Sequence, residues 1–102
     1  MKIIKDIVDE LKDELDGAEG YAERAMKYKG VDDGLSAMYA EMAKEEMGHV
    51  DKLHGRAQEI IRKYRAEKGE PPLMMQAVWD QEHKEMMKWA AEIRAMIDMT
   101  RK

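Results

Sequence analysis

Apolar and polar residues follow one another with the three-to-four-residue spacing of amphipathic helices, and no segment shows the two-residue alternation of a strand. Glycine and proline cluster with other turn-forming residues at only two places, Lys29–Gly34 and Lys68–Pro72. The pattern predicts an all-α fold of three long helices, over residues 3–29, 34–68 and 73–99, in one 102-residue domain. Because the links are short, we expect consecutive helices to be antiparallel neighbours.

Each of the first two predicted helices carries a row of apolar residues along one face. In the first it consists of Ile4, Ile7, Leu11, Ala18, Tyr21, Ala25 and Tyr28. In the second it contains Leu35, Tyr39, Met42, Leu53 and Ile60, beside a shorter row of Val50, Ala57 and Ile61. Polar residues interrupt the two main rows: Glu14 in the first, and Glu46 and His49 in the second. Burying such groups without partners costs several kcal/mol, so we expect them to bind something.

The three polar residues are expected to meet. Glu14 lies about 18 residues before the first turn, and Glu46 and His49 lie about 14 and 17 residues after it, so an equal rise per residue brings them to nearly the same height. Carboxylates and imidazoles are good ligands for iron, manganese or zinc. The spacing therefore predicts a metal site, and a hydrogen-bonded or ionic triad without metal is the alternative.

Glu14, the sequence Glu46-Met47-Gly48-His49 and Tyr21 together resemble the first half of a ferritin-like di-iron protein, such as a rubrerythrin or an encapsulated ferritin. The resemblance covers roughly residues 10 to 60. It implies a ferritin-like helical bundle in which Glu14, Glu46 and His49 ligate iron and Tyr21 lies beside the site. It also implies ferroxidase or peroxide-related activity.

The chain departs from that family because a full di-iron site needs a second Glu and a second Glu-x-x-His, usually from two further helices. Pairing of two such hairpins about a twofold axis supplies them, as in encapsulated ferritins. The three predicted helices are also long and slender for a monomer of this mass. We therefore expect a homo-oligomer, a dimer or a larger symmetric assembly.

The third predicted helix offers a different candidate. It carries Asp80, Glu82 and His83. If the second and third helices form a simple antiparallel hairpin, counting residues from the turn places His83 level with about residue 56 of the second helix. The nearest histidine there is His54, which lies in the shorter row with Val50 and Ala57. We expect either a separate His54/His83 cluster, with Glu82 or Asp80 attached, or a third helix that packs onto another subunit. His54 and His83 are therefore further candidate metal ligands.

Composition narrows the function classes. The chain has no cysteine, which excludes thiolate metal sites and disulfides. A net charge of -4 argues against nucleic acid as a partner, and no apolar run is long enough for a membrane span. The charged first turns do not look like a signal peptide, so a cytoplasmic protein is expected. The alternative to metal binding is a non-catalytic helical interaction or structural module whose buried polar triad sets helix register and partner choice.

Overall fold

The computed structural model describes residues 2–101, apart from the side chain of Met75. This part of the chain forms three helices and no strand: α1 (Lys2–Tyr28), α2 (Asp33–Lys68) and α3 (Leu73–Thr100). The all-helical prediction is confirmed, and every helix begins and ends within one residue of its predicted position.

The two links have the turn chemistry that their residues favour. Gly30 has a φ of 81°, a left-handed conformation that glycine adopts without steric cost, and Asp32 then caps α2 by accepting a hydrogen bond from the Leu35 N–H at 3.0 Å. At the second link Gly69 has a φ of 83° and donates its N–H to the Arg65 carbonyl. Each link therefore reverses the chain within a few residues.

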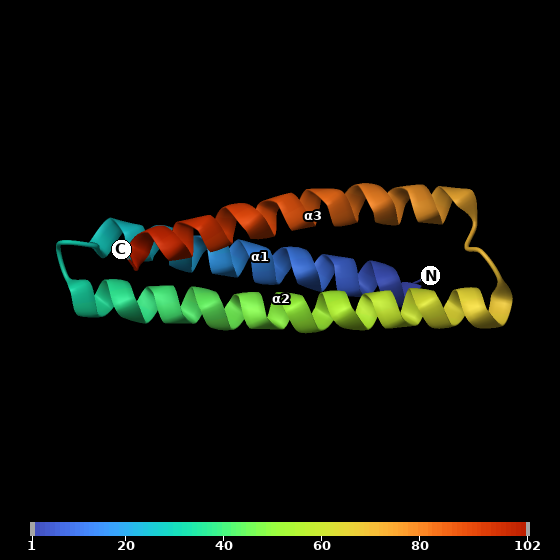
Figure 1. The fold of residues 1–102 in the computed structure, drawn as a ribbon, viewed down its shortest axis with the longest axis horizontal. Coiled ribbons are helices and arrows are strands. Elements are labelled where there is room, and N and C mark those ends of the chain that lie inside the picture. Colours follow the sequence, from blue (N-terminus) through green and yellow to red (C-terminus); the bar gives the residue numbers. More distant parts are fainter. Residues whose placement is uncertain (1, 102) are drawn as a thin grey trace.

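Figure 1 shows the three helices side by side along one axis, with α2 antiparallel to α1 and α3. The parallel pair, α1 and α3, keeps one register along its length. Lys12 pairs with Glu82, the Trp89 indole donates to Glu19, and Lys29 donates to the Met99 carbonyl, each across 70 residues of sequence. The result is a rod of 55 × 19 × 18 Å.

The core follows a strict heptad-like rhythm of alternating four- and three-residue steps, typical of helices that pack as a coiled coil. We call these positions the inner rows. On α1 the inner row is Ile4, Val8, Leu11, Leu15, Ala18, Ala22 and Ala25. On α2 it is Ser36, Ala40, Ala43, Met47, Val50, His54, Ala57 and Ile61, and on α3 it is Trp79, His83, Met86, Ala90, Ile93 and Ile97. All of these residues are buried except His54, Trp79 and His83, which are half-buried.

The inner rows correct part of the sequence prediction. The residue between Leu11 and Ala18 in the core is Leu15, and Glu14 lies beside it at the edge. On α2 the shorter predicted row is the true core. On α1 four residues of the main predicted row lie in the core: Ile4, Leu11, Ala18 and Ala25. The remaining residues of that row and the main predicted row of α2 form a half-buried surface, which we call the outer face. Its apolar members are Ile7, Tyr21 and Tyr28 of α1 and Leu35, Tyr39, Met42, Leu53 and Ile60 of α2.

Candidate metal centre

Glu14, Glu46 and His49 come together on the outer face, and we call them the acidic cluster. His49 Nδ1 lies 3.3 Å from Glu14 Oε2 and 3.9 Å from Glu46 Oε1. One ligand atom from each of the three residues lies within 4.8 Å of the others. The prediction that they meet at one height is therefore confirmed. The prediction that they occupy core positions is wrong: 53% of the His49 side chain is exposed, against 23% for Glu14 and 27% for Glu46.

The electrostatics of the acidic cluster are those of two acids competing for one proton. A hydrogen bond from the Glu46 carboxyl lowers the pKa of Glu14, and the His49 hydrogen bond and charge lower it further against the effect of burial. The same carboxyl–carboxyl bond raises the pKa of Glu46, and burial and the Glu14 charge add to this rise. Like charges this close disfavour double ionisation. A cation between the carboxylates would remove that conflict.

Gly17 lies next to this arrangement. It lies one turn after Glu14 on α1, and a Cβ built at this position would approach Glu46 Oε2 to 3.4 Å. A glycine inside a helix costs stability, since it gains nothing from side-chain packing and loses more backbone freedom than alanine on folding. At this position an added Cβ would just contact the Glu46 carboxylate, which lies against α1.

Aromatic residues continue the outer face beyond the acidic cluster. The Tyr39 ring stacks between Tyr21 and Tyr28, with ring-centre distances of 6.2 and 6.1 Å. The Arg24 guanidinium lies over both Tyr21 and Tyr39. Tyr21, predicted to lie beside the site, is thus part of a half-buried aromatic stack two helical turns from Glu14.

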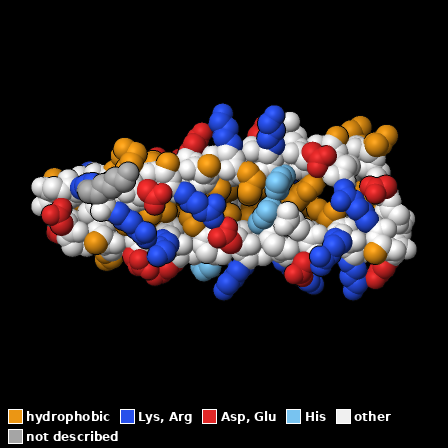
Figure 2. Space-filling model, viewed as in Figure 1, with side chains coloured by type: hydrophobic (Ala, Val, Ile, Leu, Met, Phe, Trp, Pro, Cys, Tyr) orange, Lys and Arg blue, Asp and Glu red, His pale blue; other side chains and the backbone are white. Residues whose placement is uncertain are grey.

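Two of the other candidate ligands, His54 and His83, contact each other between two helices. His54 Nε2 of α2 lies 2.7 Å from His83 Nε2 of α3, so the predicted His54/His83 contact is present, and we call it the histidine pair. Figure 2 shows histidine side chains in the middle of one face of the rod, with hydrophobic side chains on both sides. Burial and the neighbouring His83 lower the pKa of His54, which Asp51 partly offsets.

The predicted carboxylates do not join the histidine pair. Glu82 is turned to α1, where Lys12 Nζ lies 2.8 Å from its Oε2, and this ion pair raises the pKa of Lys12. Asp80 accepts a hydrogen bond from the Gln76 side chain at 2.9 Å. Both acids therefore have partners of their own, on α1 and within α3.

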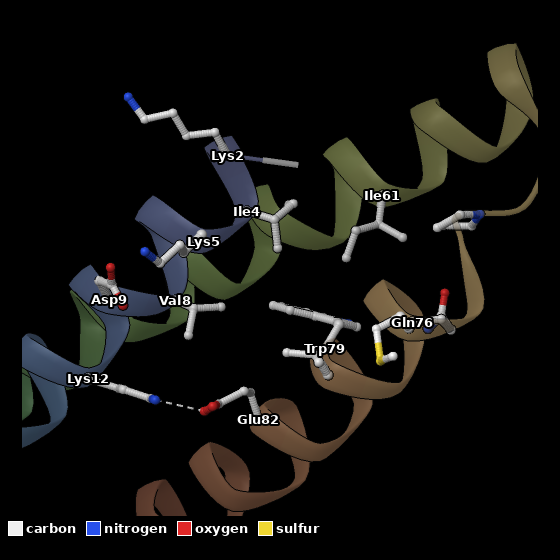
Figure 3. Close-up of a pocket in the computed structure, with 13 residues that line it drawn as sticks. Lys2, Ile4, Lys5, Val8, Asp9, Lys12, Ile61, Gln76, Trp79 and Glu82 are labelled. Atoms are coloured by element: carbon white, nitrogen blue, oxygen red, sulfur yellow. Dashed lines mark ion pairs between the residues drawn. The ribbon is translucent and has the colours of Figure 1, made fainter.

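A cleft of about 590 Å³ lies beside the histidine pair, between the first turns of α1, the end of α2 and the start of α3. Figure 3 shows its apolar lining by Ile4, Val8, Ile61 and Trp79, with the Lys12–Glu82 ion pair at one side. The Trp79 ring lies 5.7 Å from the His83 ring. The cleft lies near the histidine pair, away from the acidic cluster.

Comparison with known proteins finds no match for this chain among family models, curated proteins or solved structures. Among the described residues, no helix combines the length and the apolar character that crossing a membrane requires.

Proposed function

We propose that this chain binds a transition-metal ion, iron in the first place, through Glu14, Glu46 and His49. The observation that carries the proposal is the convergence of these three ligand atoms within 4.8 Å of one another, from two helices. Two carboxylates and one imidazole form a donor set that suits iron, manganese and zinc. The conflict between the two acids gives a cation an electrostatic reason to bind.

We further propose that a second copy completes the site. The acidic cluster supplies three ligands and has its open side on the outer face. The contacts of α3 lie elsewhere: it meets α1 at Lys12 and Glu19, on the opposite side of the inner row. Half-buried apolar residues extend from the acidic cluster in both directions along the hairpin. Two hairpins packed by this face about a twofold axis would bring together two Glu residues and two Glu-x-x-His pairs, the ligand set of ferritin-like di-iron proteins.

The chemistry proposed for such a dimer is oxidation of Fe(II) by oxygen or peroxide. Two ions held close together suit transfer of two electrons to one oxidant. This chain's part is to hold the ions. Within the described part of the chain, the Glu14 and Glu46 carboxylates have polar partners only in each other and in His49. Anaerobic loading with Fe(II), followed by oxygen, tests this activity by the growth of ferric absorbance. Oxidation no faster than in a His49→Ala control would leave a structural or iron-handling metal site.

Elemental analysis tests the binding itself. Protein expressed in iron-rich medium is compared with the Glu46→Ala/His49→Ala variant, and a His54→Gln/His83→Gln variant serves as the control. We expect about one metal ion per chain in the unmodified protein and in the control, and a loss in the first variant. Equal metal content in all three proteins would refute the proposal.

The rival function is a helical interaction module, and one contact favours it. His49 bridges the two acids, at 3.3 and 3.9 Å, so the triad provides itself with polar partners without any ion. Under this alternative a chelator leaves thermal stability unchanged. A metal site instead loses several degrees of melting temperature on stripping, because an ion that binds only the folded state stabilises it.

A further inference from the structure

The two rings of the histidine pair meet end to end between α2 and α3. The ring centres lie 4.8 Å apart and the Nε2 atoms 2.7 Å apart, with an angle of 17° between the ring planes. The difference of 2.1 Å is close to twice the distance from the centre of an imidazole ring to one of its atoms. The two Nε2 atoms therefore lie almost on the line that joins the ring centres. The rings point head-on at each other and do not stack face to face.

Head-on contact at this distance requires one proton between the two nitrogens. One ring donates its Nε2–H and the other accepts through its Nε2 lone pair, since two lone pairs or two N–H groups would repel. With each ring in its neutral form, this one shared proton satisfies both nitrogens. The two Nε2 atoms are aimed at a shared point between α2 and α3.

The surroundings supply little else that binds a cation. Asp51, one turn before His54, accepts a hydrogen bond from Arg94 at 2.6 Å, and Glu82 is held by Lys12 at 2.8 Å. Among the described residues, no third histidine or acidic side chain joins His54 and His83 in a ligand cluster. The Trp79 ring covers one side of His83. The site thus consists of two imidazole rings in a collinear arrangement.

We propose that the histidine pair is a second metal site, specific for a monovalent closed-shell ion, Cu(I), held by the two Nε2 atoms. Divalent ions such as Zn²⁺ take four or more ligands and favour anionic ones, whereas Cu(I) accepts two collinear neutral donors. With metal–imidazole bonds of about 2 Å, the nitrogens must move apart by only about 1.3 Å. Side-chain rotation on two helices that meet at this level suffices.

Binding involves no redox change. The Nε2–H proton between the rings moves to Nδ1 of the same ring through solvent, which frees both Nε2 lone pairs for the ion. No proton is released from the neutral pair, and the site gains one positive charge. This inference is independent of the acidic cluster, which binds a different class of ion through different residues.

The test is an anaerobic Cu(I) titration of the full chain in competition with a chromophoric Cu(I) chelator. We expect one Cu(I) per chain, and a loss of affinity of about 100-fold or more in His54→Gln and in His83→Gln, since each removes half of the donor set. His49→Gln, which changes the only other histidine, should bind as the unmodified protein does. Circular dichroism establishes that each variant is folded.

The unmodified protein provides a second measurement. X-ray absorption of its Cu(I) complex should show two nitrogen neighbours and the edge feature of a two-coordinate ion. In a Trp89→Phe variant, the remaining Trp79 should lose fluorescence as Cu(I) fills the site, because its ring lies next to His83. Absence of Cu(I) binding or sulfur neighbours from methionine would each overturn the proposal. So would a Cu(I) affinity of His54→Gln or His83→Gln equal to that of the unmodified protein.

Discussion

The acidic cluster and the histidine pair are both polar interruptions in apolar rows, yet they differ in charge, burial and position. The acidic cluster lies on the outer face of the α1–α2 hairpin, combines two acids with one histidine and is partly open to solvent. The histidine pair lies in the inner rows of α2 and α3, contains no acid, is half-buried, and has its two nitrogens in direct contact. One helical rod therefore places two sets of possible ligands with different chemistry. Under our proposals, the acidic cluster would hold a multivalent cation with several ligands and the histidine pair a single soft ion.

Replacing both members of the histidine pair with leucine should give the largest effect. His54→Leu/His83→Leu completes the inner rows with apolar side chains, so we expect the free energy of unfolding to rise by about 2 kcal/mol. The melting temperature should rise by roughly 10 °C. Thermal unfolding followed by circular dichroism measures it. A matched Glu14→Leu/Glu46→Leu variant on the outer face should gain much less in a monomer, because that face remains partly exposed. A fall in the free energy of unfolding of His54→Leu/His83→Leu would show that the two histidines stabilise the packing of α2 against α3.

His54 of the histidine pair and Glu46 of the acidic cluster should also respond to pH with opposite signs. The pKa of His54 is lowered from its ordinary 6.5, so below that pH the unfolded chain takes up the proton more readily than the folded protein. The stability contributed by neutral His54 is thus lost as the pH falls through 6.5 towards the folded-state pKa. The pKa of Glu46 is raised from 4.5, so its contribution is lost as the pH rises above 4.5 through the folded-state pKa.

Urea unfolding of the metal-free protein between pH 4 and pH 8 separates these two contributions. His54→Leu/His83→Leu should remove the destabilisation below about pH 6.5. Glu46→Gln should remove the decline that begins above about pH 4.5. If the pH profile of either variant follows that of the unmodified protein, the corresponding group does not titrate as its surroundings indicate.

A smaller effect is expected from neutralising Glu46 alone. Above its folded-state pKa the Glu46 carboxylate faces ionised Glu14, so there Glu46→Gln should stabilise the metal-free protein by about 0.5 kcal/mol, the scale of partly exposed charge interactions. It should also weaken iron binding. Glu41→Gln removes the same charge from an exposed position of α2 and is the control. Stabilisation of the same size in the control would mean that overall charge is responsible.

The smallest change in stability is predicted for Gly17→Ala. Alanine favours a helix over glycine by about 0.5 to 1 kcal/mol, but its Cβ would lie 3.4 Å from Glu46 Oε2 and displace the carboxylate slightly. We expect a net stability change near zero and a measurable loss of iron affinity. Gly20→Ala, whose Cβ would meet only the end of Arg24 at 3.9 Å, should gain the full helix preference and bind iron normally.

The helices and their links could be predicted because glycine, proline and capping residues mark them directly. The choice of core row could not, because apolar residues stand next to one another on α1: Ile7 beside Val8, and Tyr21 beside Ala22. Sequence reasoning favoured the larger side chains. Ala18, Ala25 and Ala57 were predicted correctly, but Ala22 and Ala43, which were not, are also fully buried, since small residues let helices approach closely, while their larger neighbours Tyr21 and Met42 lie at the rim.

The contacts within the two candidate sites could be predicted even though the core rows were partly misassigned. Equal helical height was enough to predict the contact of Glu14 with His49, because it depends only on the position of the first turn. His54 lies in the shorter row with Val50 and Ala57, which indicated that it faces the core. Counting residues from the second turn placed His83 of the third helix at nearly the same height, so their contact could be predicted. The pairing of Glu82 with Lys12 could not be predicted from the sequence, because the parallel register of α1 and α3 follows only from three-dimensional packing.

Native mass spectrometry of the iron-loaded protein is the most direct test of the acidic cluster, because it counts chains and ions in one species. We expect a dimer or a larger even-numbered assembly with one iron per chain. We also expect Glu46→Ala/His49→Ala to lose the iron and His54→Gln/His83→Gln to retain it. A metal-free monomer as the main species of the unmodified protein, after loading with excess Fe(II), would refute the proposed iron site.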